Sequence, residues 1–164
     1  MPHPYDVLDI PQRPGSLIFT PCPGTRDVCL NEALASLKAA GAQAIVTLMP
    51  DAELAANGAA DLAAACAEQG LAWLHLPVAD EQVPQADFDA GWGRHHDEIL
   101  TLLDADATLA IHCKGGSGRT GLIAARMLIE LGLDRETAVQ QVQALRPKAI
   151  QHPAHAGWLA QFGN

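Results

Sequence analysis

The chain has 164 residues, of which 49% are hydrophobic and 18% are charged, which is enough apolar sequence for one domain with a sizeable core over residues 1–164. Its net charge of −9 disfavours nonspecific binding to nucleic acid or to an anionic membrane surface. The four cysteines form no pair with metal-ligand spacing, and we find neither a secretory leader nor a long apolar run, so we expect a cytoplasmic protein without a metal site.

Hydrophobic periodicity and turn residues divide the chain into short segments of alternating type. In chain order, the pattern predicts strands at residues 5–10 and 16–20, a helix at 30–40, a strand at 44–49, helices at 51–57 and 61–69, a strand at 71–76, a helix at 87–103, a strand at 107–112, and helices at 119–131, 135–145 and 153–162. This alternation favours an α/β fold, with a central, mostly parallel sheet of about five strands and helices on both faces. Ligands of such sheets bind beyond the carboxyl ends of the strands.

A glycine-rich turn between the last predicted strand and the next helix is the most informative stretch. It reads HCKGGSGRTG over residues 112–121, and five residues separate Cys113 from Arg119. A glycine-rich turn that enters a helix can direct several backbone N–H groups at one anion, because glycine permits positive φ angles and close approach. We therefore expect a phosphate group to be bound by Lys114, Gly115, Gly116, Ser117, Gly118 and Arg119.

The residue types in this turn suit nucleophilic attack on phosphorus. The donors that hold a phosphate also stabilise the thiolate form of Cys113, which is the form that attacks. Arg119 offers a fixed fork of N–H donors that matches two phosphate oxygens. Thr120 can donate its hydroxyl to the sulfur, and His112 can orient the nucleophile. The alternative, that Cys113 is an inert core residue, leaves the arginine and the glycines unexplained.

These residues resemble a known family signature. HCKGGSGRTG is similar to the HCxxGxxR[S/T] signature of the cysteine-dependent protein tyrosine and dual-specificity phosphatases, and it lies two-thirds of the way along the chain, as in the dual-specificity group. Residues 76–84 resemble the general-acid loop of the kinase-associated (cyclin-dependent kinase inhibitor 3-like) phosphatases, and residues 146–151 resemble their glutamine-bearing segment. The resemblance covers three pieces within residues 71–151, whereas the first 70 residues match only in the order of their elements.

The resemblance assigns two further roles. It makes Asp80 the acid that protonates the leaving oxygen and then the base that activates water, although Glu81 and Asp87 are alternatives by residue type. It makes Gln151 the residue that positions the attacking water, where the alternative is a surface polar residue. The sequence before Asp80 reads Val78-Ala79 and lacks the tryptophan that larger tyrosine phosphatases have there.

The expected function is hydrolysis of phosphate monoesters through a phosphocysteine intermediate, without a metal or organic cofactor. The expected substrates and partners are phosphorylated proteins or peptides that carry phosphotyrosine, with phosphoserine and phosphothreonine as further substrates. Three alternatives stay open: a phosphate-binding module without turnover, a sulfur- or arsenic-transfer enzyme, and a phosphoinositide or small-molecule phosphatase. Lys114 favours the lipid alternative, whereas Ser117 stands where lipid enzymes usually place a second basic residue. A protective disulfide between Cys113 and either Cys22 or Cys66 is also possible on oxidation.

Overall fold

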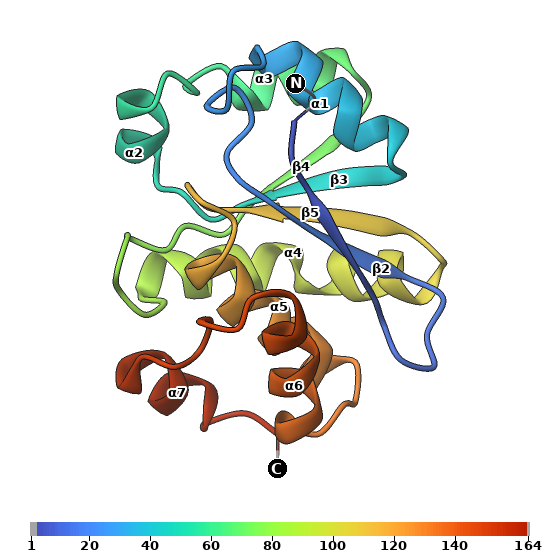
Figure 1. Ribbon diagram of the computed structural model, residues 1–164, viewed down its shortest axis with the longest axis vertical. Helices are drawn as coiled ribbons and strands as arrows, with labels where there is room; N and C mark the ends of the chain where they lie inside the picture. Colours follow the sequence, from blue (N-terminus) through green and yellow to red (C-terminus); the bar gives the residue numbers. More distant parts are fainter. Residues whose placement is uncertain (1–2, 164) are drawn as a thin grey trace.

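A five-stranded sheet forms the centre of the computed structural model, which describes residues 3–163 (Figure 1). The strands are β1 (Asp6–Asp9), β2 (Ser16–Thr20), β3 (Ala42–Thr47), β4 (Ala72–His75) and β5 (Thr108–His112). Their order across the sheet is β1-β2-β5-β3-β4, in which only the edge strand β1 runs antiparallel to its neighbour. The predicted α/β architecture with a mostly parallel sheet is confirmed.

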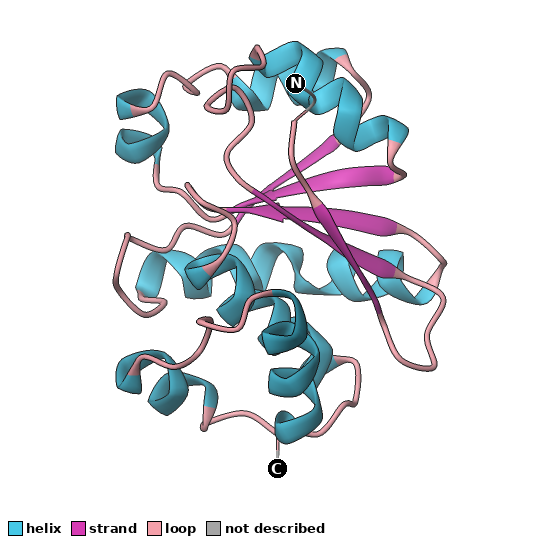
Figure 2. Ribbon diagram, in the orientation of Figure 1, coloured by secondary structure: helices cyan, strands magenta, loops and turns pink. Residues whose placement is uncertain are grey.

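Helices cover both faces of this sheet (Figure 2). On one face lie α1 (Leu30–Ala39), α2 (Asp51–Ala56) and α3 (Leu62–Glu68), and on the other lie α4 (Ala86–Asp104), α5 (Gly118–Glu130), α6 (Arg135–Leu145) and α7 (Pro153–Leu159). The strand β5 lies between two apolar layers, since Leu109 and Ile111 join the α4–α5 core and Ala110 joins the α1–α3 core. A strand that is buried on both faces needs the continuous apolar run that the sequence shows there.

The element boundaries differ from the predicted ones by at most three residues. The strand predicted at 44–49 runs from Ala42 to Thr47, and the N–H of the next residue, Leu48, still donates to the His112 carbonyl of β5 at 3.0 Å. The strand predicted at 71–76 begins one residue later, because the Leu71 N–H donates to the Cys66 carbonyl at 2.9 Å and closes the end of α3. The last helix ends at Leu159 rather than at residue 162.

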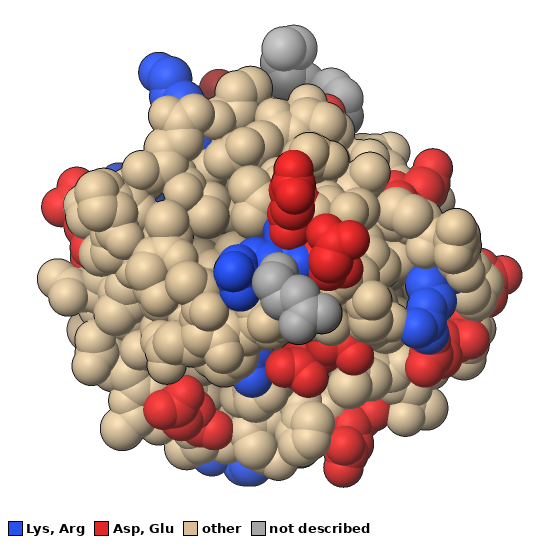
Figure 3. Space-filling view, turned by 90° about the horizontal axis from the view of Figure 1, so that it is seen from below, with Lys and Arg blue, Asp and Glu red and all other residues tan. Residues whose placement is uncertain are grey.

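The surface carries mixed charges. Figure 3 shows the face that is seen from below the molecule as drawn in Figure 1. On this face, Lys and Arg side chains form small groups that lie beside Asp and Glu side chains. The net charge of −9 therefore coexists with local basic positions. Across residues 3–163, no helix combines the length and the apolar character needed to cross a lipid bilayer.

Candidate active site

The predicted functional residues gather at the carboxyl ends of β3, β4 and β5, at the left of Figure 1. The chain after β5 forms the turn at residues 113–117 and enters α5, while the chain after β4 forms the loop that carries Asp80. The two segments are tied through the chain after β3, because Leu48 donates to the His112 carbonyl and accepts a 2.7 Å hydrogen bond from the Val78 N–H. The sheet thus brings together two segments that are more than 30 residues apart.

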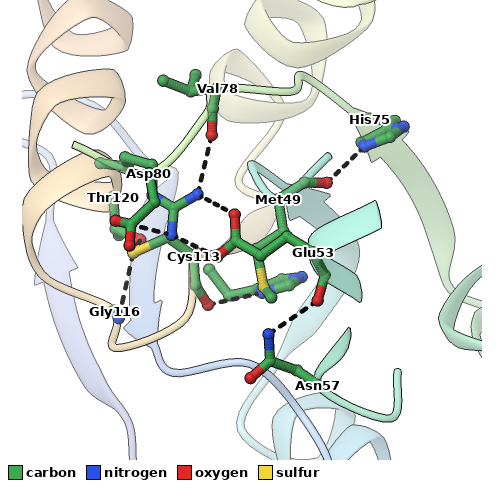
Figure 4. Close-up of polar contacts among 11 residues, drawn as sticks. Met49, Glu53, Asn57, His75, Val78, Asp80, Cys113, Gly116 and Thr120 are labelled. Carbon is green, nitrogen blue, oxygen red and sulfur yellow. Dashed lines mark hydrogen bonds and ion pairs between the residues drawn. The ribbon is translucent and has the colours of Figure 1, made fainter. Parts of the chain in front are cut away.

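The sulfur of Cys113 lies at the base of the turn (Figure 4). The Gly116 N–H and the Thr120 hydroxyl both donate to Sγ, each at 3.3 Å. Cys113 is 4% exposed, so these two donors replace the water that would otherwise surround the sulfur. Hydrogen bonds of this kind favour negative charge on the acceptor atom. The arrangement suits a thiolate nucleophile and a leaving thiolate.

Of the three glycines Gly115, Gly116 and Gly118, which permit positive φ angles, one uses this freedom. Gly116 has a φ of +78°, and a Cβ atom there would lie 2.5 Å from the Thr20 carbonyl carbon. Gly115 and Gly118 have no neighbouring atom within 4 Å of a Cβ position, and neither has a positive φ. The close approach of the turn to the end of β2 therefore depends on Gly116 alone.

Arg119 is held by a carboxylate that the sequence analysis did not identify. Its Nη1 and Nη2 atoms donate to Oε1 and Oε2 of Glu53, each at 2.7 Å, and Nη1 also donates to the Val78 carbonyl at 2.9 Å. Burial alone would lower the pKa of Arg119, but the hydrogen bonds and charge of Glu53, with further contributions from Cys113 and Asp80, raise it above its ordinary value. The guanidinium is therefore a fixed cation in a buried position.

One edge of this guanidinium faces the site. The Glu53 carboxylate occupies the edge formed by Nη1 and Nη2, while Nε has no hydrogen-bond partner among residues 3–163. The Asp80 Oδ1 lies 3.4 Å from Nη2, on an otherwise exposed side chain (68% exposed). The Nε–Nη2 edge is thus the one that can donate hydrogen bonds to two oxygens of a phosphate group.

The Asp80 loop lines a cavity of about 440 Å³ together with α5 and α7. The lining residues are Asp80, Glu81, Gly118, Arg119, His152 and His155. The loop turns sharply at Glu81, which has a φ of +62°, and the Gln82 N–H donates to the Ala79 carbonyl at 3.0 Å. The alternative acid Asp87 lies in the first turn of α4 and outside this cavity, whereas Glu81 shares it.

His112 is fully buried beneath the turn. Its Nδ1 lies 3.1 Å from the Cys113 carbonyl, which can only accept, so Nδ1 carries the proton. Its Nε2 then accepts from the Thr47 hydroxyl at 2.8 Å, and the Thr47 oxygen accepts from the Trp73 indole N–H at 2.8 Å. Burial lowers the pKa of His112 to about 4, so the ring is neutral near pH 7. His112 fixes the backbone of the nucleophile and lies too deep to contact a substrate.

Three other predicted residues lie at the edge of the site or beyond it. Lys114 and Ser117 are exposed, and the Lys114 carbonyl accepts a 3.0 Å hydrogen bond from the Cys22 N–H. The Gln151 side-chain amide donates to the Pro147 carbonyl at 2.7 Å, so in this arrangement it is bound within its own segment rather than in the cavity. The roles of all three in catalysis stay predictions.

Four residues of the site were missed by the sequence analysis. Glu53 lies in the helix that follows β3, and its position just beyond the carboxyl end of a parallel strand was a signal that could have identified it. Arg146, at the start of the glutamine-bearing segment, donates from Nε to the Gly116 carbonyl at 2.9 Å. His152 and His155 belong to α7 and its cap, where nothing in the local sequence marks them.

All four cysteines are free thiols. Burial raises the pKa of Cys22 to about 12, with smaller contributions from Glu53 and Cys113, and burial raises the pKa of Cys66 to about 11. Cys22 lies next to the Cys113 turn through its hydrogen bond to Lys114, whereas Cys66 packs in the α1–α3 core. Of the two disulfide partners considered for Cys113, Cys22 is the one with a direct link to the turn. Within residues 3–163, no group of three or more His, Cys, Asp or Glu side chains is arranged to hold a metal ion.

Comparison with known proteins places the chain in a family. The profile of a family described as Tc-R-P, polymorphic toxin system, DSP-PTPase phosphatase, matches residues 23–133. Among solved structures, the kinase-associated phosphatase with its catalytic-site cysteine replaced by serine is 25% identical, with a TM-score of 0.87 over 98% of this chain and 94% of that chain. The structure of Tk-PTP in the active form is also 25% identical, with a TM-score of 0.68 over 94% of each chain.

A more distant structure shares the fold. PTPMT1 in complex with PI(5)P is 16% identical, with a TM-score of 0.66 over 94% of this chain and 92% of that chain. No curated protein matches the chain. The family resemblance expected from residues 112–121 is therefore confirmed, and the chain belongs to the Tc-R-P family of DSP-PTPase phosphatases as a cysteine-dependent phosphatase of the dual-specificity type.

Proposed function

We propose that this phosphatase hydrolyses phosphotyrosine, and also phosphoserine and phosphothreonine, in proteins through a phosphocysteine at Cys113, with residues 1–164 acting as one phosphatase domain. The observation that carries the proposal is the pair of donors on the Cys113 sulfur, together with an Arg119 that Glu53 holds through Nη1 and Nη2 and whose Nε has no hydrogen-bond partner among residues 3–163. A cytoplasmic location belongs to the proposal, because all four cysteines are free and a nucleophilic thiolate survives best in a reducing compartment.

In the first step, the Cys113 thiolate attacks phosphorus and the bond from phosphorus to the leaving oxygen breaks. The Nε–Nη2 edge of Arg119 and the backbone amides of the turn bind the equatorial oxygens, where charge builds up. Asp80, in its protonated form, gives its proton to the leaving oxygen. The proximity of Asp80 Oδ1 to Arg119 Nη2, at 3.4 Å, supports this role because it places the carboxyl beside the expected phosphate position.

In the second step, the Asp80 carboxylate takes a proton from a water molecule, which attacks phosphorus. The sulfur–phosphorus bond breaks, inorganic phosphate leaves, and the Thr120 hydroxyl donates to the departing sulfur. Gln151 takes part only if its exposed side-chain amide leaves the Pro147 carbonyl and binds the attacking water instead. No metal or organic cofactor enters either step.

A protein substrate is favoured over a lipid by charge. The chain carries a net charge of −9, and Lys114 and Arg119 are the cations within residues 113–119, because Ser117 contributes none. Arg146 lies beside this turn but is already bound to the Gly116 carbonyl and to Asp6, so a headgroup with several phosphates finds few cations to balance it. Phosphotyrosine carries a single phosphate on a neutral ring, which suits a cavity with one fixed arginine. The cavity walls of histidine and carboxylate side chains add no further permanent cation.

The test compares hydrolysis by the wild type and by Cys113→Ser in the presence of a metal chelator, using an aryl phosphate, a phosphotyrosyl peptide, a phosphoseryl peptide and a soluble phosphoinositide. We expect metal-independent turnover that is abolished in Cys113→Ser, with the phosphotyrosyl peptide preferred. A preference for the phosphoinositide would replace the protein substrate by a lipid. Binding of phosphopeptides without turnover would instead identify a phosphate-recognition module.

A further inference from the structure

The loop that carries Asp80 is fixed to the rest of the molecule at its two ends. At the first end, the Val78 N–H donates to the Leu48 carbonyl at 2.7 Å, and the Val78 carbonyl accepts from Arg119 at 2.9 Å. Residues 79–82 at the tip are exposed and therefore have little burial to hold them. The position of Asp80 must depend on what holds the second end.

His155 of α7 holds that second end. Its Nε2 lies 3.1 Å from the Gln82 carbonyl, across 73 positions of sequence. Because a carbonyl only accepts, Nε2 carries the proton and donates. Burial lowers the pKa of His155, with a smaller opposing contribution from the Gln82 hydrogen bond, so the neutral ring is the form present near pH 7. His155 is 9% exposed, which shields this hydrogen bond from water.

The helix that carries His155 is itself firmly packed. Trp158 contacts Phe88 and Phe162 edge to face, with ring centroids 6.0 and 5.0 Å apart. The Arg126 guanidinium of α5 lies 5.6 Å from the centre of the Trp158 ring in α7, and 3.6 Å from the centre of the Phe162 ring that follows this helix, so cation–π contacts connect α7 and the chain after it to α5. Arg119 also belongs to α5. The Asp80 loop and the phosphate-binding arginine are therefore both attached to the packed pair of helices α5 and α7.

We propose that His155 is a positioning residue, which holds the loop at Gln82 so that Asp80 stays beside the phosphate site. The inference rests on the proposed role of Asp80 as the general acid. His155 lines the same cavity as Asp80, but its own contact is with the loop backbone and not with a reacting atom. The loop is then clamped by Arg119 at one end and by His155 at the other, with Asp80 between them.

Loss of this clamp has a specific kinetic signature. A leaving group that is already a weak base, such as p-nitrophenolate, needs little help from an acid, whereas phenolate needs the proton that Asp80 supplies. A loosened loop should therefore slow phenyl phosphate hydrolysis more than p-nitrophenyl phosphate hydrolysis. One net hydrogen bond corresponds to roughly a 3- to 10-fold change in the population of the held loop.

The experiment measures kcat for both aryl phosphates in five variants and the wild type. His155→Leu removes the donor at similar volume, and His155→Gln keeps an N–H at the position of Nε2. Asp80→Ala and the double variant Asp80→Ala, His155→Leu close a double-mutant cycle. His96→Leu is the matched control, because the His96 Nδ1 contacts only the Trp92 carbonyl of its own helix.

We expect His155→Leu to lower kcat for phenyl phosphate by about 3- to 10-fold and kcat for p-nitrophenyl phosphate by less than about twofold, with near-complete rescue in His155→Gln. In the Asp80→Ala background, His155→Leu should have no further effect. Amide hydrogen exchange of residues 79–85 should be faster in His155→Leu and unchanged in His96→Leu. That exchange measurement reports the clamp independently of turnover.

Two outcomes overturn the inference alone. In the first, His155→Leu has no effect, although Asp80→Ala loses activity on phenyl phosphate. In the second, His155→Leu lowers kcat equally for both substrates and does so in the Asp80→Ala background as well, which is what a merely structural residue would give. If Asp80→Ala leaves both substrates unaffected, the proposed acid is wrong and the role of His155 fails with it.

Discussion

Glu53 and Arg119 form a two-point ion pair, with both carboxylate oxygens 2.7 Å from guanidinium nitrogens. The Arg119 side chain is 4% exposed and that of Glu53 is 19% exposed, so the pair is shielded from water. Because Glu53 occupies the outer edge of the guanidinium, the orientation of the inner edge is fixed before a phosphate arrives. The carboxylate thereby restrains a flexible arginine side chain, which is what the proposed binding of a phosphate by Arg119 requires.

Replacement of Glu53 should therefore impair catalysis. Glu53→Gln removes the charge and one of the two acceptors, which leaves a buried guanidinium incompletely paired. We expect kcat/KM for an aryl phosphate to fall by roughly 100-fold, because a displacement of about 1 Å in a group that positions the substrate costs that much. Asp51→Asn is the control on the same helix, since that side chain is 92% exposed. Unchanged or higher activity in Glu53→Gln would show that the ion pair restrains Arg119 unproductively.

The glycines of the turn should respond differently to alanine. Gly116→Ala places a Cβ 2.5 Å from the Thr20 carbonyl carbon in a residue with a φ of +78°, whereas Gly115→Ala meets nothing within 4 Å. We expect Gly116→Ala to lower the melting temperature by roughly 5–10 °C and Gly115→Ala by less than about 2 °C. Thermal unfolding followed by circular dichroism measures both. Equal melting temperatures would mean that the turn can move away from β2 at little cost.

Arg146 should stabilise the turn from outside. Its Nε donates to the Gly116 carbonyl at 2.9 Å, and its Nη1 lies 2.9 Å from Asp6 Oδ2. In a trans peptide the C=O and the following N–H point in opposite directions, so this bond turns the Ser117 N–H away from Arg146. We expect Arg146→Met to lower kcat/KM on the order of tenfold, the cost of one charge-assisted hydrogen bond.

The Asp6→Asn variant separates the two partners of Arg146. It weakens the ion pair at β1 but leaves the Gly116 carbonyl contact, and Asp6 is 56% exposed, so it should retain nearly wild-type kinetics. If Asp6→Asn is as impaired as Arg146→Met, the ion pair rather than the bond to the turn is what matters.

His112 should make stability depend on pH. Its pKa is about 4 in the folded protein and 6.5 in a model compound, so the unfolded chain binds more protons between these values. The neutral His112 ring therefore contributes fully to the free energy of unfolding above pH 6.5. This contribution decreases by up to roughly 3 kcal/mol as the pH falls to 4. His112→Asn keeps a donor for the Cys113 carbonyl and removes the titration.

Urea unfolding at several pH values between 4 and 7 measures this effect. The wild type should lose more stability than His112→Asn across that window. The difference between the two proteins isolates His112 from the other histidines whose pKa is lowered, namely His3, His95 and His155. Parallel pH profiles for the two proteins would show that His112 is not the titrating group.

The sequence was sufficient for the fold class and for the residues that lie close together along the chain. The turn at residues 112–121 could be identified because its cysteine, glycines and arginine act within one loop and one helix end. The central strands followed from nearly continuous apolar runs and the edge strand β1 from a short run between turn residues, with boundary errors of at most two residues. Local chemistry and local periodicity carry this information directly.

Contacts between distant segments could not be predicted in the same way. Glu53 is one of several carboxylates in helices, and only the fold shows that it reaches across 66 positions to Arg119. His155 likewise meets the Asp80 loop through the packing of α7, in which Trp158 contacts Phe88 of α4 and the Arg126 guanidinium of α5. The positive φ of Gly116 follows from the approach of β2, which a single sequence does not reveal.

The most direct test of the central claim is detection of a phosphoryl group on Cys113 during turnover. Asp80→Ala is mixed with p-nitrophenyl phosphate, quenched in acid within milliseconds to seconds, and examined by intact-protein and peptide mass spectrometry. We predict a phosphorylated form that accumulates, because loss of the base slows the second step, and that maps to Cys113. Turnover without any phosphorylated protein, or phosphorylation that persists in the double variant Asp80→Ala, Cys113→Ser, would contradict the phosphocysteine mechanism.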